Sequence, residues 1–149
     1  MLRKEESSAV YRILDANINR LREGLRVIEE YARFAAVEEN VSLELKSLRH
    51  SLRELEDAVG RDNLLNSRDT VTDPFSGEGR AEEFCRRGAV DVCIASFRRA
   101  QEAGRVLEEY IKVTTFPEVS NRAKAIRFAL YDLEKRMIAG LRHDGRAQE

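Results

Sequence analysis

The chain is poor in the residues that build metal centres and disulfide frameworks, with only two cysteines and two histidines. Cys85 and Cys93 stand eight positions apart, and no further Cys or His follows at the spacing of a zinc site. A zinc centre or a disulfide is therefore disfavoured. We expect reduced, partly buried thiols that pack as small hydrophobic groups.

Long apolar segments and an excess of one charge are missing too. No run of about 18 apolar residues occurs, which excludes a membrane-spanning helix. The first residues carry neither an apolar core nor a cleavage pattern, so we expect a cytosolic protein. The 26 basic and 27 acidic residues nearly balance, which leaves no net field to hold nucleic acid.

The familiar nucleotide-binding and metalloprotease motifs are also absent. The sequence contains no Gly-x-x-x-x-Gly-Lys-Ser/Thr, no Gly-x-Gly-x-x-Gly and no His-Glu-x-x-His. If the protein uses a nucleotide, it needs another kind of site.

What the chain does have is an internal repeat. The run Arg26-Val27-Ile28-Glu29-Glu30-Tyr31 returns 79 positions later as Arg105-Val106-Leu107-Glu108-Glu109-Tyr110. Segments 46–56 and 124–134 also correspond, at an offset of 78. Two copies of one helical hairpin explain this pattern, because each unit of a repeat buries its apolar stripe against its neighbour. His50 is replaced by Phe128 in the second copy, which argues against a catalytic imidazole.

Apolar residues recur at three- and four-residue steps in four segments, as in amphipathic helices. The stripe of the first segment consists of Val10, Leu14, Ile18, Leu21, Leu25, Ile28 and Ala32. A short connection at 37–40 would return the second helix antiparallel to the first. We therefore predict an all-α fold, a four-helix bundle built from two sequence-related antiparallel helical hairpins with a long central loop.

The predicted helical domain is a single unit over residues 8–142. Its parts are a first repeat at about 8–60, a loop at 61–80 and a second repeat at about 81–142, with disordered tails at 1–7 and 143–149. Ser7 or Ser8 would cap the first helix, Gly60 would end the second, Gly88 would kink the third and Pro117 would open the fourth.

Charged residues follow the borders of the apolar stripes in both copies. One interpretation pairs Arg49 with Glu29 or Glu56, which would fix the register of the first hairpin. Arg127 would pair in the same way with the matching carboxylates of the second copy. The alternative turns these groups toward a cleft between the hairpins, where arginines would bind phosphate and carboxylates would hold hydrated magnesium.

The loop at 61–80 has no counterpart within either repeat, and long loops in compact domains are usually functional or mobile. Arg68, Asp69 and Asp73 stand in it among several hydroxyl-bearing residues. The two aspartates could cap turns and leave Arg68 solvated. They could equally belong to a ligand site.

Several segments resemble a helical family of thiamine synthesis, which occurs alone or fused ahead of thiamine phosphate synthase. The first segment is 12–20, which contains Asp15-Ala16-Asn17. The second is 22–34, which contains Arg22-Glu23-Gly24-Leu25-Arg26-Val27-Ile28-Glu29-Glu30-Tyr31. The others are 48–50, 68–69, 99–103 and 105–110. The resemblance covers about residues 10–135. It departs from the family pattern after Asp73, where Pro74-Phe75 stands in place of Val-Gly.

The family is described as a hydroxymethylpyrimidine phosphate kinase, so the resemblance implies ATP-dependent conversion of a pyrimidine phosphate to its diphosphate. Phosphoryl transfer requires positioning and charge neutralisation, which arginines and carboxylates supply. Our expected site residues follow from the stripe borders and the shared segments. They are Arg49, Arg68 and Asp69 for catalysis, Asn17, Arg22 and Arg26 for substrate binding, and Asp69, Asp73 or Glu29 for magnesium.

The sequence alone is also compatible with other functions. The chain could be a non-catalytic helical module that docks on thiamine phosphate synthase. It could also pair with itself through small residues of the third helix, Ala100 and Gly104. Activity with the pyrimidine phosphate and ATP would separate a kinase from such a module.

Overall fold

The architecture consists of two helical hairpins packed face to face. The computed structural model describes residues 1–77, 79 and 85–146, with side chains described as far as Leu141. The helices are α1 (Lys4–Glu30), α2 (Glu39–Val59), α3 (Arg61–Ser67), α4 (Ala89–Ile111) and α5 (Ser120–Arg146). No strand occurs in this part of the chain, and the predicted all-α bundle is confirmed.

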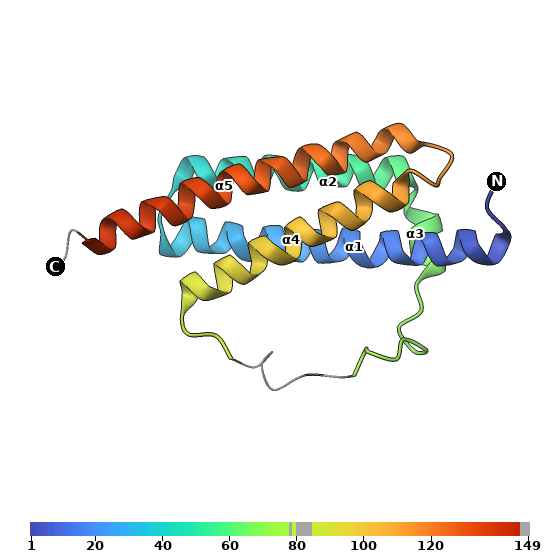
Figure 1. Cartoon of the computed structure of the whole chain (residues 1–149), viewed down its shortest axis with the longest axis horizontal. Helices are drawn as coiled ribbons and strands as arrows, with labels where there is room; N and C mark the ends of the chain where they lie inside the picture. Colours follow the sequence, from blue (N-terminus) through green and yellow to red (C-terminus); the bar gives the residue numbers. More distant parts are fainter. Residues whose placement is uncertain (78, 80–84, 147–149) are drawn as a thin grey trace.

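The first hairpin pairs α1 with α2, and the second pairs α4 with α5 (Figure 1). Helix α1 runs antiparallel across α4 in the most extensive contact of the bundle, while α2 lies beside α5. Exposed ion pairs join α2 to α5 at two levels, Glu54 to Arg122 at 2.6 Å and Glu44 to Arg136 at 2.5 Å.

The core is formed by the stripes expected from the helical periodicity. All seven stripe residues of the first helix are buried, and Leu14, Leu21, Leu25 and Ile28 have no exposed surface. Phe97 and Leu107 of α4 and Leu130 of α5 are equally enclosed. Burying a large aliphatic or aromatic side chain stabilises a fold by about 1.5–3 kcal/mol, so this cluster supplies most of the driving force for folding.

Helices α1 and α4 approach each other closely at Gly24. A Cβ atom built on Gly24 would lie 3.1 Å from Cβ of Ala100 and 3.2 Å from the backbone oxygen of Ser96. Gly104 has the same role toward α5, with Cβ of Arg127 at 3.3 Å. The small residues therefore set the spacing between helices inside one chain.

The helix boundaries differ from the sequence prediction at the N-terminus. Helix α1 begins at Lys4 without a side-chain cap, so residues 4–7 are helical and neither Ser7 nor Ser8 caps it. Glu5 and Glu6 lie in its first turn, where negative charge interacts favourably with the helix dipole.

Helices in the second repeat also begin and end at other residues than predicted. Gly88 precedes α4 and does not kink it, and residues 81–84, part of the expected start, lie outside the described residues. Pro117 opens a 3-10 turn, Pro117–Val119, and α5 follows and continues to Arg146. Part of the expected C-terminal tail is thus helical, and 147–149 lie outside the described residues.

The backbone conformations that reverse the chain differ between the two ends of α2. A π-helix, Tyr31–Ala35, follows α1, and Val37 then takes a left-handed φ of 54°, a strained conformation for a β-branched residue. At the other end Gly60 ends α2 with φ of 102°, as predicted. Helix α3 begins at once and buries Leu64 against the bundle. The first seven residues of the expected loop are therefore helical.

Among the described residues, none of the helices is both long and apolar enough to cross a bilayer.

Candidate functional site

Most of the charged residues at the stripe borders hold the hairpins together. Arg49 donates to both carboxylate oxygens of Glu29, at 2.6 and 3.1 Å. Arg127 donates two hydrogen bonds, from Nε at 3.0 Å and from Nη2 at 2.7 Å, to one carboxylate oxygen of Glu108. The repeat thus forms the same interhelical ion pair twice, as the first interpretation of these residues predicted.

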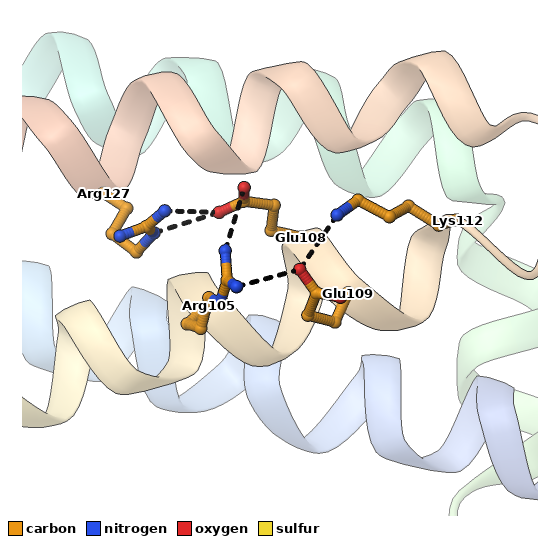
Figure 2. A network of polar contacts seen from close by, with 5 residues as sticks. All are labelled: Arg105, Glu108, Glu109, Lys112 and Arg127. Atoms are coloured by element: carbon orange, nitrogen blue, oxygen red, sulfur yellow. Dashed lines mark hydrogen bonds and ion pairs between the residues drawn. The ribbon is translucent and has the colours of Figure 1, made fainter.

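The second pair is part of a larger network on α4 (Figure 2). Arg105 lies 3.3 Å from both Glu108 and Glu109, and Lys112 donates to Glu109 at 2.9 Å. The hydrogen bonds that Arg127 donates to Glu108 raise the pKa of Arg127. Glu108 is enclosed between two guanidinium groups, whereas Glu109 faces solvent.

Two further residues expected in the site also form ion pairs. Arg22 donates to Glu56 at 2.7 Å, and Arg26 lies 3.8 Å from Glu29 and 3.7 Å from Glu30. Arg22 and Arg49 therefore join α1 to α2, whereas both ion pairs of Arg26 lie within α1. The structure does not bring Arg22, Arg26, Arg49 and Glu29 together in one cavity.

The other expected residues do meet. Asn17, Arg68, Asp69 and Asp73 line a cavity of about 550 Å³ between α1 and the segment after α3, which we call the loop cavity. Its remaining lining residues are Ala9, Arg12, Ile13, Asp15, Ala16, Asn19, Arg20, Thr70, Thr72 and Pro74. Residues far apart in the sequence are thus brought to one concave surface.

At the loop cavity, Arg68 of the loop and Asp15 of α1 form an ion pair with two hydrogen bonds. Arg68 donates from Nε to one Asp15 oxygen at 2.8 Å and from Nη2 to the other at 2.9 Å. These bonds raise the pKa of Arg68. Asp15 is buried, so the pair anchors the loop on the middle of α1.

The two loop aspartates cap turns. Asp69 accepts from the backbone N–H of Thr72 at 3.0 Å and from the Thr72 hydroxyl. These bonds hold the pKa of Asp69 below its usual range, so it remains a carboxylate into acid conditions. Asp73 accepts from the backbone N–H of Phe75 at 2.9 Å.

The carboxylates expected to bind magnesium do not assemble into a site of their own. No group of three or more His, Cys, Asp or Glu side chains that could hold a metal occurs within the described ranges. Arg49 neutralises Glu29, while Asp69 and Asp73 stand at the loop cavity. Magnesium often takes only one or two carboxylates when phosphates complete its shell, and Asp69 and Asp73 fit that requirement.

A second hollow, the α1/α4 groove, adjoins the loop cavity. It has a volume of about 650 Å³ and is lined from α1 by Asn17, Arg20, Glu23, Gly24 and Val27, and from α4 by Ser96, Arg99, Glu102, Ala103 and Val106. Asn17 and Arg20 line both hollows. Sequence reasoning did not assign Arg20 to the site, although its presence in both repeats was a usable signal.

Comparison with known proteins then identifies the family. The sequence profile of the ThiD2 family matches residues 12–136. The chain belongs to the ThiD2 family. No solved structure gives a significant match to it.

Curated relatives of this ThiD2 family chain are longer proteins. Thiamine-phosphate synthase of Nostoc punctiforme is 38% identical over 141 residues, which are 95% of this chain and 39% of the relative. The enzymes of the same name from Gloeobacter violaceus and Thermosynechococcus vestitus are 40% and 43% identical, over 91% and 87% of this chain and 38% and 36% of their own length. The ThiD2 chain therefore spans less than two-fifths of each, and the expected link to thiamine phosphate synthase is confirmed at this level.

Proposed function

We propose that the protein phosphorylates 4-amino-5-hydroxymethyl-2-methylpyrimidine phosphate with ATP and releases the diphosphate and ADP. Membership of the ThiD2 family and relatives named thiamine-phosphate synthase support a role in thiamine biosynthesis. The observation that carries the proposal is the loop cavity, which gathers arginines, carboxylates and hydroxyl groups from α1 and the loop.

The side chains of the loop cavity suit phosphoryl transfer. Enzymes that transfer phosphoryl groups position the two substrates and neutralise the charge on the phosphates, and the protein itself rarely needs to form covalent bonds. Arg12 and Arg20 line the cavity from α1, and Arg68 lines it from the loop. Guanidinium groups bind phosphate oxygens in a bidentate manner. We assign Arg12 and Arg20 to the phosphates of ATP, while Arg68, whose guanidinium is held by Asp15, contributes its positive charge to the cavity.

Magnesium would enter with the nucleotide. Asp69 and Asp73 would hold it, and it would neutralise charge on the phosphates of ATP. The chain's own contribution is to fix the two carboxylates through their turn-capping bonds, so that they need little reorganisation when the nucleotide binds.

A coupled assay of ADP release tests the proposal. With the pyrimidine monophosphate, ATP and magnesium, we expect steady ADP release and formation of the diphosphate. The unphosphorylated alcohol is the matched control for substrate choice and should be used poorly. Purified, folded protein that releases no ADP with either substrate would rule out the kinase function.

A second function is favoured by the length of the relatives. Because the chain matches only 36–39% of three proteins named thiamine-phosphate synthase, it could act as a non-catalytic module that binds the rest of such an enzyme. Sedimentation of the chain with a separately produced synthase barrel would reveal that association. The same experiment without the barrel tests self-association.

A further inference from the structure

The α1/α4 groove is built from repeated parts. Each residue that lines it from α1 has its counterpart in the second repeat on the opposite wall: Asn17 and Ser96, Arg20 and Arg99, Glu23 and Glu102, Gly24 and Ala103, Val27 and Val106. The two walls therefore carry the same sequence of polar, charged, small and apolar positions. Helices α1 and α4 run antiparallel, so the groove has approximate two-fold symmetry (Figure 1).

The charged residues of the groove differ from the other charged pairs of the repeat. Most of those, such as Arg49 and Glu29, form an ion pair that joins or braces helices. In the described part of the chain, neither Arg20 nor Arg99 forms an ion pair with an acidic group. Likewise, neither Glu23 nor Glu102 forms one with a basic group. All four are exposed at the groove. Both repeats thus retain charged groups that do nothing for the register of the helices.

The base and walls of the groove suit a small planar anion. Asn17 and Ser96 are buried polar residues, and the small residues Gly24 and Ala103 line the groove beside them. Val27 and Val106 add apolar surface. A volume of about 650 Å³ lies within the usual range for small-molecule sites, roughly 300–1,000 Å³.

We propose that the α1/α4 groove binds the phosphorylated aminopyrimidine, an assignment that rests on the proposed kinase function. Arg20 and Arg99 bind its phosphate from opposite walls. Glu23 or Glu102 accepts a hydrogen bond from the exocyclic amine, and the valines contact the ring. The nucleotide occupies the loop cavity.

The junction of the two hollows then sets the path of the reaction. Arg20 and Asn17 line both, so the acceptor phosphate and the γ-phosphate of ATP meet beside Arg20. An oxygen of the pyrimidine monophosphate attacks the γ-phosphorus, and the bond from that phosphorus to the β–γ bridging oxygen breaks. ADP leaves with those electrons, and the pyrimidine diphosphate forms. Arg20 stabilises the charge on the group in transfer.

A comparison of two neighbouring arginines of α4 tests the groove assignment. Arg98 and Arg99 are both exposed, but only Arg99 lines the groove. Titration calorimetry should show Arg99→Ala weakening pyrimidine monophosphate binding by roughly tenfold or more, the loss expected for a charge-assisted hydrogen bond. Arg98→Ala should stay within about twofold of the wild type. Circular dichroism establishes that both variants fold.

A second comparison tests the junction. Arg20→Ala should weaken binding of both ATP and the monophosphate, while Arg99→Ala should leave ATP binding unchanged. Equal effects of Arg98→Ala and Arg99→Ala, or no effect of Arg99→Ala, would overturn the groove assignment even if the wild type is an active kinase. Arg99-dependent binding without diphosphate formation would count against the kinase function and support the groove as a binding site. A wild type that binds no monophosphate would overturn both.

Discussion

The guanidinium of Arg49 and the carboxylate of Glu29 form a two-point ion pair between α2 and α1, with bonds of 2.6 and 3.1 Å. Arg127 and Glu108 form its counterpart between α5 and α4. The pairs lie at the borders of the core, where each arginine can reach its partner in one helix register only. They specify how each hairpin aligns, while the apolar stripes supply most of the stability.

Removing one partner of the second pair should be costly. In Glu108→Ala the Arg127 guanidinium, whose side chain is 13% exposed, loses its main partner. We expect the free energy of unfolding in urea to fall by about 2–3 kcal/mol, somewhat less than for a fully buried pair. Glu109→Ala is the matched control on the same helix turn. Its ion pairs are exposed, so the loss should be much smaller. Equal losses would show that Glu108 is not a register-fixing residue.

The close approach of α1 and α4 at Gly24 can be tested with a single methyl group. Gly24→Ala would place Cβ 3.1 Å from Ala100 and 3.2 Å from a backbone oxygen, so the helices must move apart. We expect a loss of about 1–3 kcal/mol in unfolding free energy. The control Gly140→Ala meets nothing within 4 Å and should instead stabilise α5 by up to about 1 kcal/mol. A stabilising Gly24→Ala would contradict the described packing.

If the loop cavity binds ATP as proposed, Arg68 should be important for nucleotide binding. Arg68→Ala removes a cation from the cavity and the anchor of the loop on Asp15. Binding of magnesium-ATP, followed by calorimetry, should weaken by roughly tenfold or more. Arg61→Ala is the control, since Arg61 of α3 lies outside the cavity and is 3.8 Å from Glu56. If both variants bind ATP like the wild type, the nucleotide lies elsewhere.

Cys93 should make the fold sensitive to alkali. Burial raises the pKa of its thiol to about 12, whereas an unfolded cysteine titrates near 8.5–9. Between these values the unfolded chain loses a proton that the folded chain keeps, so stability falls as pH rises. The slope is about 1.4 kcal/mol per pH unit for this one group.

Urea unfolding at several pH values from 8 upward measures that slope. The slope should become shallower in Cys93→Ala and stay unchanged in Cys85→Ala, because Cys85 is exposed. The same difference in exposure predicts that a thiol reagent labels Cys85 quickly in the folded protein and Cys93 only after unfolding.

Periodicity alone predicted the bundle because each long helix carries an apolar stripe of three- and four-residue steps. The ion pairs of Arg49 and Arg127 were also predictable, since the repeat placed matching charges at matching borders. Helix α3 was not predictable from its own seven residues. It depends on the turn at Gly60 and on burial of Leu64 against other helices, which is a tertiary effect.

The candidate site was predictable only in part. The loop pattern pointed to Arg68, Asp69 and Asp73, and the border of α1 pointed to Asn17. Arg22, Arg26 and Arg49 looked equivalent in sequence, and only the structure shows that a carboxylate lies beside each of them. The Asp15 partner of Arg68 lies 53 positions away, so no local pattern could reveal it.

Under the proposed function, the bond between Asp15 and Arg68 also predicts how many nucleotides bind to each chain. The second repeat has Ile94 where the first has Asp15, and isoleucine cannot hold a guanidinium group. Only one end of the near-symmetric groove can therefore adjoin an anchored loop. Although the scaffold is doubled, a titration should saturate at one nucleotide for each polypeptide.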